Sequence, residues 1–187
     1  MPRLFVAVEP PAEARTHLDQ ALDPLRGAPG QPRWIPAERW HLTLLFLGAV
    51  GDHDVAALEA AVGEAVAQAP AMRLRLAGAG RFGPLRRPQV FWAGLEGDAG
   101  ALTDLAERLR AAVRALGLPV EDRAFRAHLT VGRWRPGAPA DVALPGRLAG
   151  YRGPEWPVTG VALMQSHLGR PVPYETVAAW PVTRRTP

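Results

Sequence analysis

Residues 41–48 read His-Leu-Thr-Leu-Leu-Phe-Leu-Gly, and residues 128–133 read His-Leu-Thr-Val-Gly-Arg. Each segment joins a His-x-Thr triplet to apolar neighbours that are typical of a buried strand. Side chains alternate across a strand, so the histidine and the threonine of each triplet share one face, while the residue between them points into a core. The repeat therefore predicts two similar lobes, each presenting one imidazole and one hydroxyl to a common cleft.

The pattern outside these segments mixes helices and strands without a regular βα alternation. Apolar residues recur at helical spacing in some segments, while short apolar or alternating runs bounded by glycine and proline predict strands. We expect an α+β fold and a single domain over residues 1–187, made of two pseudo-symmetric lobes. The expected helices cover about 11–26, 52–69 and 99–116; the expected strands cover about 5–8, 40–47, 72–76, 90–93, 127–134, 157–167 and 173–182; and segments 77–88 and 135–155 are expected to be loops.

Composition excludes several classes of site. The chain has no cysteine and no lysine, which excludes disulfides, thiolate metal sites, Schiff bases and Walker-type phosphate loops. All 22 basic residues are therefore arginine, and the net charge of +4 permits an anionic ligand. No apolar run approaches the roughly 18 residues of a membrane helix, and no HExxH or similar ligand cluster occurs. We expect a cytoplasmic protein with no membrane contact and no catalytic metal.

Two histidines and two threonines around one gap suit the cleavage of a cyclic phosphodiester. Near neutral pH one histidine can be neutral and activate water, while the other is charged and protonates the leaving oxygen. Threonine hydroxyls can donate hydrogen bonds to the non-bridging phosphate oxygens and hold the phosphorus in line. The alternative interpretation is that both histidines are half-buried strand residues with satisfied hydrogen bonds and no chemical role.

These motifs and their order resemble those of the 2H phosphoesterases, and in particular of the bacterial RNA 2',3'-cyclic phosphodiesterases, also called 2'-5' RNA ligases. The resemblance covers nearly the whole chain. Besides the two His-x-Thr motifs, it includes Arg-Leu-Phe-Val-Ala-Val at 3–8, Arg-Trp-Ile-Pro at 33–36, Phe-Gly-Pro at 82–84, Trp-Ala-Gly-Leu at 92–95, Leu-Met-Gln-Ser at 163–166, and Tyr174.

The resemblance implies a two-lobed fold in which two antiparallel-type sheets flank a central cleft, with helices outside. It implies that His41 is the proton donor to the departing ribose oxygen and that His128 is the proton acceptor that activates water. Thr43 and Thr130 would bind the phosphate, the product would carry a 2'-phosphate, and no cofactor would be needed. Joining 2' and 5' RNA ends would be the related chemistry in reverse.

Four further residues are candidates for substrate binding. Arg133 matches the arginine that follows the family's second motif, but strict alternation puts it on the face opposite His128 unless the strand bends. Arg126 shares the face of that histidine and is the alternative cation. Tyr174, which fits the family pattern, and Phe46 could stack a terminal base, with core packing as the alternative for each. Core packing is the favoured interpretation for three other aromatic residues, Phe82, Trp92 and Trp134.

The implied partner is an RNA that ends in a 2',3'-cyclic phosphate, such as a tRNA half, or a nucleoside 2',3'-cyclic phosphate. One domain suffices for the site, so we expect a monomer. Departures from the family pattern, at Arg39-Trp40, Ala127 and Val131, leave the substrate preference open. The alternatives are a phosphodiesterase of ADP-ribose cyclic phosphate or of 2',5'-oligoadenylate, and an RNA-end-binding protein without catalysis.

Overall fold

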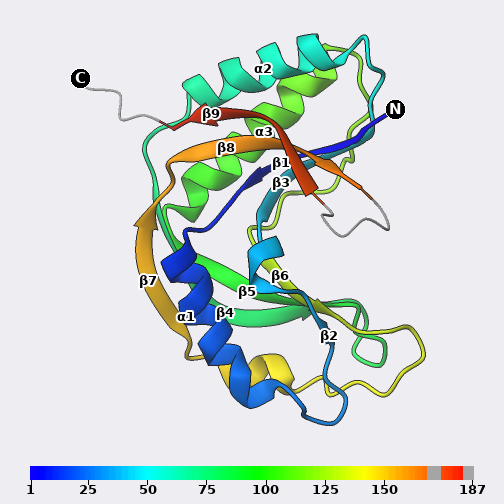
Figure 1. Cartoon of the computed structure of the whole chain (residues 1–187), viewed down its shortest axis with the longest axis vertical. Helices are drawn as coiled ribbons and strands as arrows, with labels where there is room; N and C mark the ends of the chain where they lie inside the picture. Colours follow the sequence, from blue (N-terminus) through cyan, green and yellow to red (C-terminus); the bar gives the residue numbers. More distant parts are fainter. Residues whose placement is uncertain (168–173, 183–187) are drawn as a thin grey trace.

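Two antiparallel sheets form the framework of residues 1–167 and 174–182, which the computed structural model describes (Figure 1). The four-stranded sheet has the order β3 (Leu42–Ala49), β1 (Arg3–Val8), β8 (Gly160–Ser166), β9 (Tyr174–Pro181). The five-stranded sheet has the order β2 (Arg33–Trp34), β6 (Leu129–Arg133), β5 (Val90–Gly97), β4 (Arg73–Phe82), β7 (Arg152–Pro157). The α+β fold with two antiparallel sheets, expected from the sequence, is confirmed.

Helices cover one side of each sheet. In Figure 1, α2 (Val55–Ala67) and α3 (Ala99–Ala115) run together behind the four-stranded sheet, while α1 (Ala12–Leu22) lies across the five-stranded sheet. Short 3-10 helices follow α1, precede β3 and precede β7: η1 (Asp23–Leu25), η2 (Ala37–Arg39) and η3 (Leu144–Leu148). Among the described residues, no helix combines the length and the apolar character that a membrane span requires.

One hydrophobic core connects the two sheets and the helices. Leu18 and Leu22 of α1 lie one turn apart and are fully buried, and Leu105 and Leu109 of α3 repeat this arrangement. This spacing gives each helix an apolar stripe, which faces its sheet. The same core therefore holds both sheets in one body.

The face of each sheet that points away from this core is called the inner face below. On the four-stranded sheet it carries a second, smaller apolar cluster of Phe5, Ala7, Ala162 and Met164, with Tyr174 packed against it. On the five-stranded sheet Trp92 pairs with Gly80 on one side and with Thr130 on the other. Directly paired residues share a face, so these three lie opposite the fully buried Phe91 and Leu129.

Two segments expected to be loops contain strands. β4 continues to Phe82, through glycines that the sequence placed in a loop starting at residue 77, and segment 135–155 contains η3 and most of β7. β7 is an edge strand, where Pro154 and Pro157 are tolerated because their missing N–H groups are not needed for pairing. The prolines that suggested a loop are therefore compatible with this strand.

Other boundaries also differ from the expected ones. The first helix ends at Leu22, and Pro24, which lacks an N–H group, lies in the 3-10 turn that follows. The strand expected over 157–167 is divided between the end of β7 and β8, and Pro173, at the start of the last expected strand, lies outside the described residues. The two motif strands begin one residue after each histidine rather than before it.

Each motif strand has a β-bulge directly after its threonine. In β6, Thr130 pairs with Trp92 but Gly132 pairs with Phe91, so Val131 is an extra residue. The same irregularity occurs in β3, where Leu44 is the extra residue between the threonine and the next pair. A bulge of one residue reverses the alternation of the side chains that follow it.

The two bulges return the third residue after each threonine to the inner face. Arg133 pairs with Val90, which neighbours Trp92 on that face by alternation, and Phe46 pairs with Phe5 of the inner cluster. The strict alternation that put Arg133 opposite the histidine is therefore wrong for this strand. Both motifs instead present three side chains at relative positions 1, 3 and 6 on one face.

Candidate active site

His41 lies immediately before β3 and is fixed on two sides. Its Nδ1 atom is 2.9 Å from the backbone oxygen of Arg39. Its ring packs against Phe5, with 4.9 Å between ring centroids, and meets the ring of Tyr174 edge-on at 5.0 Å. The inner face of the four-stranded sheet therefore holds the imidazole in a defined orientation.

His128 lies immediately before β6 in a matching environment. Its Nδ1 atom is 2.6 Å from the backbone oxygen of Arg126, again two residues earlier in the chain. The ring of Phe82 meets the imidazole edge-on, with centroids 4.8 Å apart, and the Arg126 guanidinium carbon lies 5.0 Å from the centroid of the same phenyl ring. Each motif thus combines a carbonyl acceptor and an aromatic support for its histidine.

These carbonyl contacts determine the tautomer of both rings. A backbone carbonyl can only accept a hydrogen bond, so Nδ1 of His41 and of His128 carries the proton. In the neutral ring Nε2 then has a free lone pair, and in the charged ring it carries a second proton. Each histidine can therefore act through Nε2 as a base when neutral and as an acid when charged.

The electrostatic environments of the two rings differ. Burial lowers the pKa of His41 below its usual 6.5, the Arg39 carbonyl opposes this shift, and the charge of His128 lowers the pKa further. Burial also lowers the pKa of His128, against the effect of the Arg126 carbonyl, and the positive charges of Arg126 and Arg133 add to the lowering. The rings on the two sheets are thus close enough to interact, and the arginine charges favour the neutral form of His128 in particular.

The eight residues predicted from the sequence fall into two groups. The group of the four-stranded sheet is His41, Thr43, Phe46 and Tyr174, and the group of the five-stranded sheet is His128, Thr130, Arg126 and Arg133. Both threonines are half-buried, while both arginines are exposed. Phe46 is 58 % exposed, which leaves most of its ring free to stack against a ligand.

Phe5 is the neighbour of the first histidine that the sequence did not single out. It lies in an apolar run typical of any buried strand, and only the pairing of β1 with β3 brings it to His41. Phe82 and Trp92, for which core packing was favoured, line the inner face instead, with ring centroids 5.5 Å apart. The positions of all three depend on strand register, which the residue pattern alone does not contain.

Trp92 lies directly over a glycine of the neighbouring strand. A Cβ atom at Gly80 would be 2.8 Å from the Cε2 atom of the indole and closer still to two other ring atoms. We expect Gly80→Val to displace the indole and to lower the free energy of unfolding by about 1–3 kcal/mol. Urea denaturation measures this loss.

Gly100→Ala is the matched control for that substitution. A Cβ atom at Gly100, in α3, would meet nothing within 4 Å, and alanine is the better helix former. We expect this variant to be at least as stable as the parent. A Gly80→Val protein with the stability of the parent would contradict the tight packing of Trp92.

Two other histidines have partners of their own. His17 Nδ1 is 3.0 Å from the hydroxyl of Tyr151, whose pKa burial raises to about 12, and His167 Nε2 is 3.0 Å from a carboxylate oxygen of Glu175. In the part of the chain that the structure describes, no three histidine, aspartate or glutamate side chains gather as metal ligands would.

Known proteins are similar to this chain over most of its length. The model of the 2'-5' RNA ligase superfamily matches residues 7–170. The chain is 36% identical to an RNA 2',3'-cyclic phosphodiesterase of Thermus thermophilus, over 94% of this chain and 87% of that protein. It is 31% identical to a protein of the same name from Geobacillus stearothermophilus, over 95% of this chain, and spans 56% of the length of that relative.

Solved structures extend the similarity to the fold. The crystal structure of Escherichia coli LigT complexed with 3'-AMP superposes with a TM-score of 0.79 at 27% identity, covering 98% of this chain and 99% of that one. The crystal structure of TT0787 of Thermus thermophilus gives a TM-score of 0.78 at 32% identity, with 98% and 100% coverage. Because the family model matches residues 7–170, and because a curated relative is 36% identical over most of both chains, the chain belongs to the 2'-5' RNA ligase superfamily.

Proposed function

We propose that the chain hydrolyses the 2',3'-cyclic phosphate at the end of an RNA to a 2'-phosphate and a free 3'-hydroxyl. The observation that carries this proposal is the matched geometry of His41 and His128. They directly precede β3 and β6, two strands that contact each other, and each has Nδ1 bound to a carbonyl and Nε2 left for chemistry. Opening a cyclic diester with water needs one proton acceptor and one proton donor. The name of the relatives, RNA 2',3'-cyclic phosphodiesterase, supports this substrate.

The two histidines account for the proton transfers. Neutral His128 accepts a proton from water at Nε2 while the water oxygen attacks phosphorus. The bond between phosphorus and the 3' oxygen breaks opposite the attacking oxygen, and charged His41 donates its Nε2 proton to the departing oxygen. One phosphorus–oxygen bond forms and one breaks, and solvent then restores the starting protonation states. The arginine charges beside His128, which favour its neutral form, support this division of roles.

The remaining polar groups of the inner faces would hold the phosphate. Thr43 and Thr130 can donate hydroxyl hydrogen bonds to the non-bridging oxygens, where negative charge increases in the transition state. Arg133, returned to the inner face by the bulge at Val131, supplies a guanidinium for the same oxygens. Phe46 and Tyr174 offer aromatic surface to the terminal base.

The same step can use a second nucleophile. When the 5'-hydroxyl of a second RNA takes the place of water, attack on the cyclic phosphate gives a 2'-5' linkage with the same proton transfers.

We propose that the chain acts as a monomer and as one domain over residues 1–187, because one core joins both sheets. RNA ends such as those of tRNA halves, in the cytoplasm, are the proposed substrates.

The decisive experiment uses the full chain and a short RNA with a 2',3'-cyclic phosphate end, in buffer with EDTA. We expect a product that elutes with an authentic 2'-phosphate standard and not with the 3'-phosphate, at the same rate with and without EDTA. ADP-ribose cyclic phosphate and 2',5'-oligoadenylate are tested beside it. Turnover of either one instead of the RNA, or RNA binding without turnover, would contradict the proposal.

The pH dependence of this activity follows from the lowered pKa values of the two histidines. Activity rises as His128 loses its proton and falls as His41 loses its own, which gives a bell-shaped profile. Because both pKa values lie below the usual 6.5, we expect the maximum of kcat/KM on the acid side of pH 6.5. Bound phosphate favours the charged rings, so the kcat profile should lie at higher pH. Rates from about pH 4 to 9 test this, and a flat profile would contradict it.

A further inference from the structure

A row of arginine side chains continues from the active site to the edge of the five-stranded sheet. Arg33 of β2 pairs directly with Arg133 of β6, so the two share the inner face. Arg135 follows two residues later, and the residue between them, Trp134, stacks on the core residue Phe91 with 5.7 Å between ring centroids. The antiparallel pairing continues one residue past β6, where the Trp134 N–H donates to the backbone oxygen of Gln89, so alternation puts Arg135 on the same side as the other two arginines.

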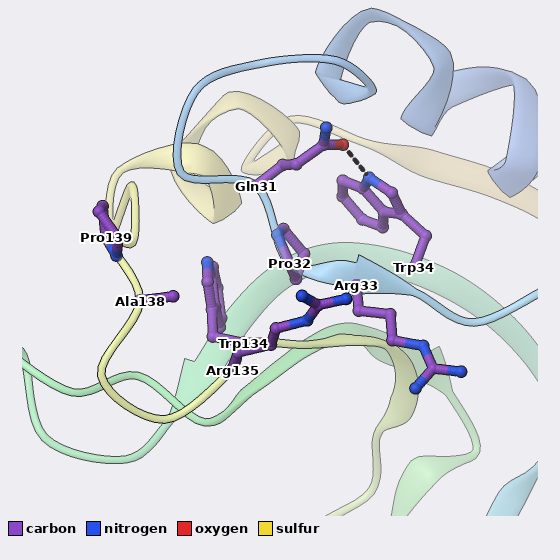
Figure 2. A pocket seen from close by; sticks show the side chains of 8 residues that line it. All are labelled: Gln31, Pro32, Arg33, Trp34, Trp134, Arg135, Ala138 and Pro139. Atoms are coloured by element: carbon purple, nitrogen blue, oxygen red, sulfur yellow. Dashed lines mark hydrogen bonds between the residues drawn. The ribbon is translucent and has the colours of Figure 1, made fainter.

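These arginines border a pocket at the end of the sheet. Figure 2 shows Arg33 and Arg135 on one side of it, with Gln31, Trp34 and Trp134 among the other lining residues, and its volume is about 380 Å³. The indole of Trp34 donates a hydrogen bond of 2.6 Å to Gln31, and the indole of Trp134 donates one of 2.9 Å to a backbone oxygen. The aromatic walls are therefore fixed before any ligand arrives.

The three arginines of this row lie close together without carboxylate partners. Among the described residues, no carboxylate lies within ion-pair distance of Arg33, Arg133 or Arg135. Several arginines elsewhere are neutralised by acidic residues: Arg73 and Arg75 by Glu155, Arg152 by Glu96, Arg114 by Asp122, and Arg147 by Asp141. Positive charges gathered without counter-charges repel one another and attract an anion.

The position of the row indicates which anion it fits. Neighbouring strands lie about 4.8 Å apart, and alternate residues of an extended segment lie about 6.6 Å apart, so Arg33, Arg133 and Arg135 begin at intervals of about 5–7 Å. A single phosphate fills one such position, whereas the backbone of an RNA strand presents a phosphate at every nucleotide. Guanidinium groups bind phosphate oxygens in pairs of hydrogen bonds, which gives the row its complementarity to such a strand.

We propose that Arg33 and Arg135 bind backbone phosphates on the 5' side of the terminal nucleotide, so that the protein prefers an RNA end to a mononucleotide. The proposal rests on the proposed function, because a terminal phosphate held between the two histidines sets the register of the strand. Arg133 then lies between the site of the reacting phosphate and the two arginines that bind the rest of the RNA. The pocket beside Arg33 and Arg135 provides space for the nucleotide that these phosphates join.

The test measures binding and does not depend on turnover. The full chain is titrated against a fluorescent oligoribonucleotide with a 2'-phosphate end, which is the proposed product and is not consumed. We expect Arg33→Gln and Arg135→Gln each to raise the Kd of the protein for this oligoribonucleotide by about tenfold. The slope of log Kd against log salt concentration should fall by about 0.7 for each arginine removed, as for one lost phosphate contact on a single strand. Competition by adenosine 2'-phosphate should stay within about twofold of the parent, because a mononucleotide does not extend to these arginines.

Arg108→Gln is the matched control, because it removes one positive charge from α3, behind the other sheet. We expect it to change neither the Kd of the oligonucleotide nor its salt dependence. An unchanged Kd in both test variants, or an equal loss for the oligonucleotide and the mononucleotide, would overturn the proposal. Arg33 and Arg135 are exposed, so both variants should fold. Thermal denaturation of the two variants and the parent checks this.

Failure of this inference can be told apart from failure of the proposed function. Hydrolysis of adenosine 2',3'-cyclic phosphate by the parent tests the function alone, since that substrate carries no further phosphate. If the parent hydrolyses it while the arginine variants bind RNA like the parent, only the phosphate row is wrong. If the parent hydrolyses neither the mononucleotide nor RNA, the function is wrong, and the binding titration still decides the phosphate row.

Discussion

Replacing either His41 or His128 by alanine is expected to lower kcat on an RNA 2',3'-cyclic phosphate by about 10²–10⁴-fold. Each ring transfers one proton in the same step, and only water remains to do so after the substitution. His53→Ala is the matched control, because this side chain is 83% exposed and lies 3.3 Å from its neighbour Asp54. We expect the control to keep the activity of the parent. A loss below about tenfold in both His41→Ala and His128→Ala would contradict the two-histidine mechanism.

A substrate with sulfur in place of the 3' oxygen should separate the roles of the two histidines. A thiolate leaves without being protonated because its conjugate acid is far stronger than that of an alkoxide, so the acid becomes dispensable while the base does not. With this substrate we expect His41→Ala to recover most of its lost rate and His128→Ala to recover none. Recovery of the rate in the His128→Ala variant instead would show that His128 is the acid and His41 the base. Single-turnover rates with both substrates measure the effect without interference from product release.

The faces of the histidines and threonines could be predicted from sequence, because they depend only on a spacing of two residues within one strand. The position of Arg133 could not. It depends on the bulge at Val131, and an extra valine among apolar neighbours looks like any other strand residue. The bulge becomes visible only when the partner strand is known, since it is defined by two residues opposing one.

Long-range pairing also explains two other differences between the prediction and the structure. The prolines of β7 favour a loop when they are considered alone, and only their place at the sheet edge makes them compatible with a strand. Phe5 lies far from His41 in sequence and meets it because β1 pairs with β3. Local periodicity thus predicts which side chains of each motif share a face, whereas the groups that orient them follow from tertiary structure.

Arg133→Gln is expected to lower kcat/KM by about 10²–10³-fold, and Arg126→Gln by less than about tenfold. The bulge returns Arg133 to the inner face beside Thr130, where its guanidinium can meet the phosphate. The guanidinium of Arg126 is instead stacked over Phe82, and its contact with His128 is made by a backbone oxygen that glutamine retains. Steady-state kinetics on the cyclic phosphate RNA measures both losses.

The pH profiles of these two variants provide the control for that comparison. Both arginine charges lower the pKa of His128, so removing either one raises that pKa and moves the ascending limb of the profile to higher pH. We therefore expect a similar shift of the limb in both variants but a large loss of maximal rate only in Arg133→Gln, because only that side chain binds the phosphate. A larger loss of maximal rate in Arg126→Gln would identify Arg126 as the phosphate-binding cation. The bulge at Val131 would then orient the strand without supplying a ligand to the substrate.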